Sequence, residues 1–186
     1  DIAVTIAVEA LAALGALVTG VLLLIPTFAL RALRDVPAAD GIRIMDAINL
    51  ATAKPIRCLV YGAALPCLVA APMWFVDWSW RRLEERAAMM AIAGGVIYGV
   101  GFILVTVERS TPLNRLLGTA TDASADMVWR VYRRDWGLWN RVRLAACAAA
   151  GALLIAAIVL HAMFAIDRNE GMCPLVTRCL ASPART

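Results

Sequence analysis

The residues best suited to chemistry lie close to the ends of long apolar segments. Trp136, Asn140 and Arg143 are spaced i, i+4 and i+7, so a helix places them on one face, with Trp139 one step from Asn140. Two interpretations remain open. In the one that we favour, Arg143 pairs with Glu108 or extends to the lipid headgroups. In the other, these residues form a small polar pocket, roofed by tryptophans, that binds a lipid-soluble aromatic or quinone-like molecule.

Further polar side chains lie near the ends of the apolar segments. An unpaired charge at membrane depth is unfavourable, and we therefore expect these groups to face one another or a water-filled cavity. They are Glu9, Asp46, Asn49, Glu108, Arg109 and Asn114.

Metal and haem sites need several histidine, cysteine or carboxylate ligands, and this chain has one histidine, His161. Near the end of an apolar segment, such a residue is more often interfacial or hydrogen-bonded than a ligand, and we favour that interpretation. The sequence has no glycine-rich phosphate loop and no Ser–His–Asp order of the hydrolase type. No metal and no cofactor are therefore predicted, and a quinone, a pigment or a lipid remains as the class of ligand.

The elements that hold these residues follow from hydropathy. Of the 186 residues 62% are hydrophobic and 17% are charged, which is more apolar than a water-soluble domain. Four uncharged stretches are each long enough to cross about 30 Å of hydrocarbon as a helix, and their continuous apolar character excludes a barrel. We predict an all-α, four-helix transmembrane bundle over residues 1–166, with spans at about 8–31, 56–76, 87–108 and 140–166. A polar C-terminal tail follows over residues 167–186.

The connections carry their own signals. The first long loop has apolar residues at helical spacing, and the third has a helical pattern around Asp122–Arg134. We expect both to form short amphipathic helices at the membrane surface. Gly94, Gly95 and Gly99 in the third span predict close helix packing and a contact with other membrane subunits.

The distribution of charge predicts the orientation. Most Lys and Arg residues lie in the first and third loops, which places both termini on the non-cytoplasmic side of what we expect to be a bacterial cytoplasmic membrane. Cys173 and Cys179 flank a short stretch of the tail, and an oxidising compartment there would favour a disulfide between them. The net charge of +4 comes from arginines beside apolar runs, which indicates contact with lipid headgroups and not with nucleic acid.

Three motifs resemble the anthrone oxygenase-like family, which consists mostly of uncharacterised bacterial membrane proteins with four predicted spans. The motifs are Gly41–Asn49 followed by Pro55, Thr111–Asn114, and Trp136–Arg143 leading into an Ala-rich helix, and the resemblance covers the chain from about Gly15 to Leu160. It implies the four-helix fold. Some relatives are linked to the oxidation of anthrones to anthraquinones. By that analogy Asn49, Asn114, Trp136, Asn140 and Arg143 would line the substrate site, with Trp139 beside them.

Two classes of function follow from these observations. The first, which we favour because metal and nucleotide motifs are lacking, is a non-catalytic accessory or structural subunit of a larger membrane complex, or a binder of a hydrophobic ligand. The second is a cofactor-independent monooxygenase of the anthrone oxygenase type, acting on a lipid-soluble aromatic substrate. Its catalytic candidates are Glu108, Asn140 and Arg143, with Glu108 as the base because the chain is so poor in histidine.

Overall fold

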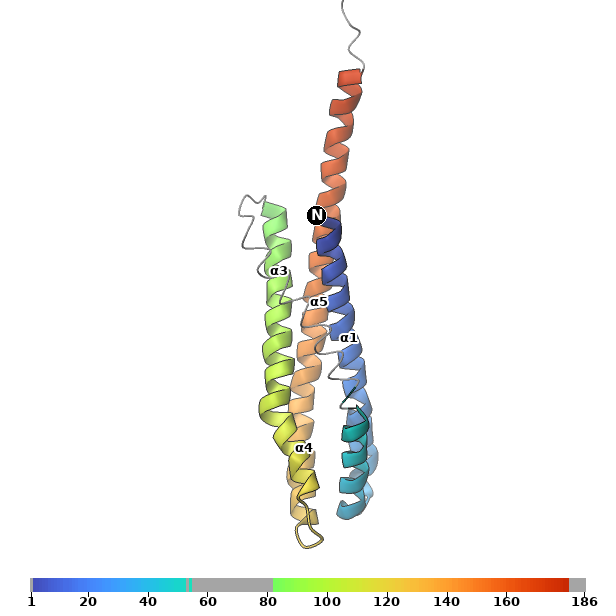
Figure 1. Ribbon diagram of the computed structural model, residues 1–186, viewed down its shortest axis with the longest axis vertical. Coiled ribbons are helices and arrows are strands. Elements are labelled where there is room, and N and C mark those ends of the chain that lie inside the picture. The colour runs from blue at the N-terminus through green and yellow to red at the C-terminus, as the bar shows by residue number, and fades with distance from the viewer. Residues whose placement is uncertain (1, 53, 55–81, 181–186) are drawn as a thin grey trace, which may run out of the picture.

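The computed structural model describes residues 2–52, 54 and 82–180, and it describes side chains over residues 3–52, 54 and 85–166. Helices are the only regular structure in these ranges, which confirms the all-α fold class. Three long helices lie side by side (Figure 1): α1 (Ile2–Ala32), α3 (Arg82–Tyr98) and α5 (Ala125–Leu180). The second predicted span, 56–76, lies outside the described residues.

Three segments of the described chain are long and apolar enough to cross a membrane. They are Ala3–Asp35, Glu85–Gly118 and Ala125–Ile166, and they contain the first, third and fourth predicted spans. Large apolar side chains cover the outside of the bundle, among them Leu14, Val21, Phe28, Val96, Val100 and Val159. An apolar outer surface of this extent needs lipid as its solvent, so the chain is a membrane protein.

Small residues allow α5 to approach both neighbouring helices closely. A Cβ atom added at Gly94 would lie 3.2 Å from the Ala150 carbonyl oxygen, and one added at Gly101 would lie 2.5 Å from the Ala146 Cβ atom. This is the packing that the glycines of the third span predict, but it takes place within the chain. Gly94 therefore faces α5 and not a partner subunit, whereas Gly99 has no neighbouring side chain within 4 Å of such a Cβ atom.

The third span changes its winding as it approaches the basic end of the bundle. After α3 the backbone forms two π-helical stretches, Gly99–Leu104 and Thr106–Ser110, and then α4 (Thr111–Gly118). Pro112 lies in the first turn of α4, and its ring cannot fit behind a regular α-helical turn. The wider turns before it remove that clash, and they rotate the residues that follow relative to an ideal helix.

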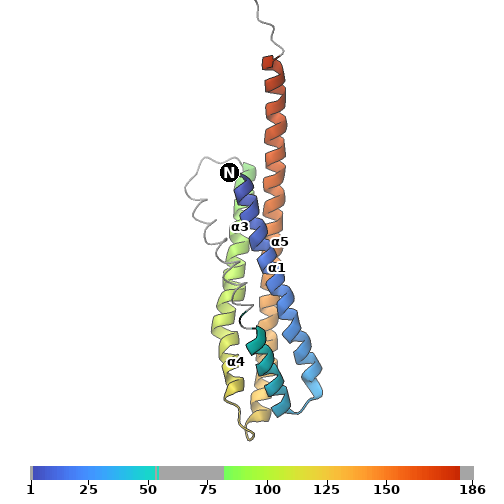
Figure 2. The same ribbon diagram turned by 45° about the vertical axis from the view of Figure 1, so that its right-hand side comes forward.

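The short helix predicted in the first loop is present over residues 38–52, after a 3₁₀ turn at Leu33–Asp35. It runs antiparallel to the end of α1 (Figures 1 and 2), and its apolar residues Ile42 and Met45 are buried in one cluster with Trp129 of α5. Protein thus covers part of its apolar surface, while Ile44 and Leu50 are exposed. Its position at a membrane surface stays a prediction.

The helix predicted around Asp122–Arg134 is not separate from the fourth span. It begins at Ala125 and continues through the span as α5, so the amphipathic helix of the third loop is α4. The end of the chain also differs from expectation, because α5 continues to Leu180 where we predicted a loop in a polar tail. The side chains of Cys173 and Cys179 lie outside the described ones, so the disulfide between them stays a prediction.

Candidate functional site

Asn140 and Arg143 form a buried polar group at the centre of the helix bundle. Asn140 is 1% exposed, and its side-chain amide donates hydrogen bonds to the Leu23 carbonyl oxygen at 3.1 Å and to the Thr27 hydroxyl at 2.6 Å. Its side-chain oxygen accepts a 2.6 Å hydrogen bond from Nη2 of Arg143. Asn140 therefore fixes the guanidinium group by linking it to α1.

Arg143 is a buried cation with no carboxylate beside it among the described side chains. Its side chain is 5% exposed, and the guanidinium carbon lies 5.4 Å from the centre of the Trp136 ring. No carboxylate among the described side chains lies within ion-pair distance of Arg143. The Nε atom of Arg143 and the indole Nε1 of Trp136 are both buried without a hydrogen-bond partner. Buried donors are normally satisfied, and these two point to an acceptor that would occupy the site.

The predicted pairing of Arg143 with Glu108 is wrong. Glu108 is exposed on the outer side of the Thr106–Ser110 stretch, and Arg109 beside it stacks on Trp139, with its guanidinium carbon 5.0 Å from the ring centre. The wide π-helical turns change which residues share a face, so the position of Glu108 near the end of the span did not give the direction of its side chain. As a general base, Glu108 is therefore on the wrong side of the helix.

A second polar group reaches α5 at Tyr132, about two helical turns before Asn140. The Asn49 amide donates to the Asn114 side-chain oxygen at 3.3 Å and to the Tyr132 hydroxyl at 3.1 Å, and the Tyr132 hydroxyl can donate to Asn114 at 3.2 Å. The structure thus brings Asn49 and Asn114 together, from segments far apart in the sequence. Tyr132 completes the group, and the sequence analysis missed it although it lies four residues before Trp136.

Tyr132 connects the two polar groups. Its ring stacks on that of Trp136 with 5.8 Å between centres, and it belongs to the part of α5 that precedes the 140–166 span. Its hydroxyl can donate a hydrogen bond to the Asn114 side-chain oxygen.

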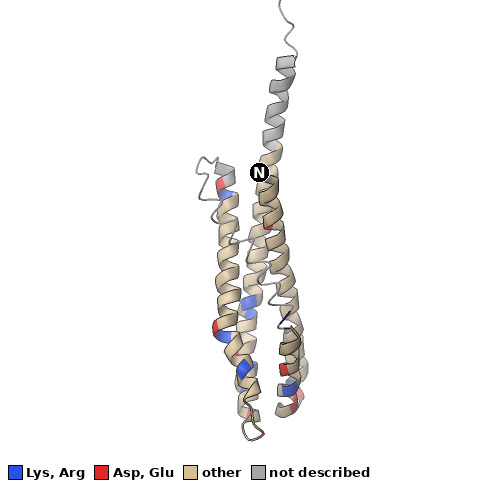
Figure 3. Ribbon diagram, viewed as in Figure 1, with Lys and Arg blue, Asp and Glu red and all other residues tan. Residues whose placement is uncertain are grey.

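A cavity of about 480 Å³ opens beside the first polar group, between the end of α1 and the start of α5. It is lined by Thr27, Leu30, Arg31, Arg34, Arg133, Gly137 and Arg141. Thr27 is shared, because its hydroxyl accepts the hydrogen bond from Asn140. Figure 3 shows that charged residues gather toward this end of the bundle.

A comparison of the sequence with models of protein families gives a match. The model for anthrone oxygenase matches residues 57–153, just over half of the chain. The chain belongs to the anthrone oxygenase family. Neither the curated proteins nor the solved structures that were compared give a match.

The family match divides the polar residues into two sets. Within residues 57–153 lie the site residues of α4 and α5, namely Asn114, Tyr132, Trp136, Asn140 and Arg143. Asn49, Thr27 and the arginines of α1 lie outside the match. The matched residues thus include the buried cation Arg143 and Trp136 beside it. Outside the match, α1 bonds Asn140 through Leu23 and Thr27, and Asn49 of the 38–52 helix bonds Tyr132 and Asn114.

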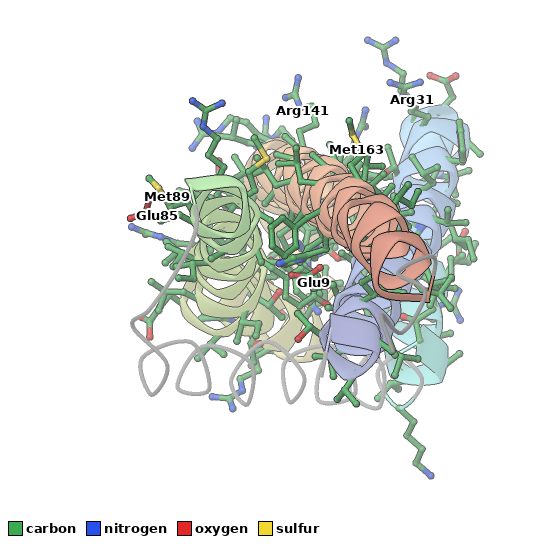
Figure 4. All side chains as sticks on the ribbon, turned by 90° about the horizontal axis from the view of Figure 1, so that it is seen from above. Glu9, Arg31, Glu85, Met89, Arg141 and Met163 are labelled. Carbon is green, nitrogen blue, oxygen red and sulfur yellow. The ribbon has the colours of Figure 1, made fainter. Side chains whose placement is uncertain are left out.

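A third polar pair lies at the other end of the bundle, outside the family match. Nδ1 of His161 is 3.0 Å from Oε2 of Glu9, and each side chain is 3% exposed. Figure 4, a view along the bundle, shows Glu9 turned inward between the helices. The hydrogen-bonded interpretation of His161 is therefore confirmed. No group of three or more metal-binding side chains is found in the described part of the chain.

Proposed function

We propose that this protein binds a lipid-soluble aromatic compound that carries an acidic oxygen, such as a phenol or an enol, with that oxygen facing Arg143. The observation that carries the proposal is the buried guanidinium group, which has no carboxylate beside it in the part of the chain that the structure describes. A cation at membrane depth is strongly disfavoured unless an anion or a set of acceptors accompanies it. An ionised ligand oxygen would supply that missing charge.

The surroundings of Arg143 suit a flat ligand. Asn140 uses its oxygen on Arg143 and its amide on α1, so the guanidinium group is held in one orientation. A planar guanidinium presents its donors in a fixed fork, and this geometry recognises a ligand oxygen better than a flexible ammonium group does. Trp136 and Tyr132 form an aromatic wall next to it. Aromatic walls with a few fixed polar groups are typical of sites for small apolar ligands.

The accessory-subunit interpretation, which we favoured from the sequence, stays a prediction. Of the glycine face that would contact other subunits, Gly94 packs against α5, while a Cβ atom at Gly99 would meet nothing within 4 Å among the described residues. A ligand that enters the bundle explains the unpaired donors of Arg143 and Trp136, which a purely structural role leaves unexplained.

Oxygenation of the bound ligand is the second candidate, and family membership favours it. In the reaction of an anthrone with dioxygen, one oxygen atom becomes the new ring carbonyl, and the other leaves as water with the two methylene hydrogens. Loss of the first proton forms an enolate, and Arg143 would stabilise its negative oxygen. Neither Glu108 nor His161 is well placed to act as the base. Glu108 is exposed, and His161 lies about 27 Å from Arg143 along α5, at 1.5 Å per residue. We therefore assign Arg143 to anion stabilisation.

Ligand binding can be tested with 1,8-dihydroxyanthraquinone, whose visible absorption shifts when its phenol ionises. The full chain in a neutral detergent should bind it and shift its spectrum toward the ionised form. Arg143→Gln should weaken binding by a factor of about 10–150, which corresponds to one charge-assisted hydrogen bond. The matched control is Arg109→Gln, which removes an arginine that also stacks on a tryptophan but lies on the outer side. It should change affinity by less than about twofold, as surface charges usually do.

A second variant tests the charge without removing the arginine. Asn140→Asp puts a carboxylate next to Arg143 and so supplies an internal anion. We expect this variant to fold and to lose the spectral shift. If Arg143→Gln and Asn140→Asp both fold and bind the dye like the unchanged protein, the proposal is wrong.

Oxygenase activity needs a separate readout. With 1,8-dihydroxyanthrone as substrate, oxygen uptake and anthraquinone formation should exceed the spontaneous rate measured with detergent alone. One oxygen molecule should be consumed for each anthraquinone formed. Tight binding without turnover would remove the second candidate and leave the first in place.

A further inference from the structure

The cavity between α1 and α5 is lined by arginines and faces outward. Arg31 and Arg34 come from the end of α1 and the turn after it, and Arg133 and Arg141 come from α5. Its other lining residues are Thr27, Leu30 and Gly137, so no acidic side chain lines it. In the view along the bundle, Arg31 and Arg141 both point outward on the same side (Figure 4). Four cations around one hollow repel one another unless an anion lies between them.

Two of these arginines are held by the protein backbone, and not by carboxylates. Nη1 of Arg133 donates to the Arg34 carbonyl oxygen at 3.1 Å, which joins α5 to the end of α1. Nε of Arg141 donates to the Gly137 carbonyl oxygen at 3.3 Å. Arg134, the residue after Arg133, differs from them. It forms a surface ion pair with Asp135 and does not line the cavity. The arginines of the cavity thus keep guanidinium donors available for an external anion.

Beyond the cavity the surfaces of both helices become apolar. The cavity residues of α1 are Thr27, Leu30 and Arg31, and the exposed Leu24 lies about one turn earlier on the same side of the helix. On α5 the exposed Ala145 and Ala148 follow Arg141 at helical spacing and leave room because of their small side chains. The surface therefore changes from cationic to apolar along one line. A membrane lipid has the same sequence of parts, a charged headgroup followed by acyl chains.

We propose that this groove binds the phosphate of an anionic membrane lipid, with the headgroup among Arg31, Arg34, Arg133 and Arg141 and an acyl chain along Leu24 and Ala145. Arginine suits this role because its fork of N–H donors binds phosphate oxygens in pairs. The site is distinct from the proposed aromatic site, since none of its four arginines contacts Asn140 or Arg143 through a hydrogen bond. A free phosphate ion shares the chemistry, so the experiment must separate the two sources.

The test uses the full chain in a neutral detergent and counts bound lipids by native mass spectrometry. Phosphatidylglycerol should bind with one tight equivalent, and phosphatidylcholine should not displace it. In Arg31→Gln/Arg141→Gln, the affinity for phosphatidylglycerol should fall by about 25-fold, about fivefold for each arginine near the headgroup. Each single change should give an intermediate loss, which keeps the test informative if the double variant is unstable.

The control removes the same charge elsewhere on the same end of the bundle. Arg115 and Arg130 are exposed and do not line the cavity, and Arg115→Gln/Arg130→Gln should bind the lipid within about twofold of the unchanged protein because exposed, distant charges are screened. An equal loss in both double variants would show a general surface attraction and overturn the proposal. Binding of inorganic phosphate without binding of phosphatidylglycerol would assign the groove to a soluble anion and overturn the lipid.

Discussion

Gly101 offers the most direct test of how closely α5 packs against the third span. A Cβ atom at this position would lie 2.5 Å from the Ala146 Cβ atom, whereas carbon atoms in contact lie about 3.5–4.0 Å apart. The methyl group of Ala146 cannot rotate away, so Gly101→Ala forces the two backbones apart by about 1 Å. Overpacking of this kind lowers the free energy of unfolding by about 1–3 kcal/mol.

Gly99 provides the matched control. It lies in the same π-helical stretch, and a Cβ atom there would meet nothing within 4 Å. Gly99→Ala should therefore leave stability unchanged or raise it by up to about 1 kcal/mol, because alanine loses less backbone entropy on folding. The free energies of unfolding of Gly101→Ala and Gly99→Ala should therefore differ by about 2–3 kcal/mol.

The assay is unfolding by sodium dodecyl sulfate in mixed micelles, followed by circular dichroism and tryptophan fluorescence. Ala146→Gly should rescue Gly101→Ala, since it removes the opposing methyl group, and the double-mutant cycle measures this coupling. Arg143 lies one turn before Ala146, so Gly101→Ala should also weaken binding of the dihydroxyanthraquinone dye. Equal unfolding midpoints for the two glycine variants, or no rescue by Ala146→Gly, would refute the close packing.

Two further predictions concern the other buried polar groups. Glu9→Ala should lower the free energy of unfolding by about 3–5 kcal/mol because it leaves His161 buried without its carboxylate, and Glu9→Gln should lower it by less in the same assay. Tyr132→Phe should lower the free energy of unfolding by about 1–2 kcal/mol at neutral pH, because it removes the hydroxyl that is hydrogen-bonded to Asn49 and Asn114.

Hydropathy and helical period were sufficient to predict much of the fold and part of the site from the sequence. The apolar runs located three spans within the described residues, because a helix in lipid needs a minimum length of uncharged chain. The spacing of Trp136, Asn140 and Arg143 placed them on one face of α5, where all three are buried. This succeeded because that part of α5 is one uninterrupted helix, so a local rule was enough.

The partners of these residues could not be read from the same rules. Glu108 lies within the second of two stretches of wider winding, and a count at 3.6 residues per turn does not give the direction of its side chain. The contact of Glu9 with His161, and that of Asn140 with Leu23, depends on how distant helices are aligned. A single sequence has no local signal for such alignment. Only the unfavourable energy of a lone buried charge indicated that partners must exist.

α5 carries both proposed sites on neighbouring stripes of one helix. Tyr132, Trp136, Asn140 and Arg143 face the interior, and Arg133, Gly137 and Arg141 follow the inner residues by one position and line the outward groove. One residue is about 100° of helix rotation, so one helix can present an inner and an outer surface at the same depth. Thr27 touches both, because it lines the groove and accepts the hydrogen bond from Asn140. A lipid that fixes the end of α1 against α5 would therefore also hold Asn140, and through it the orientation of Arg143, while the two sites keep separate ligands.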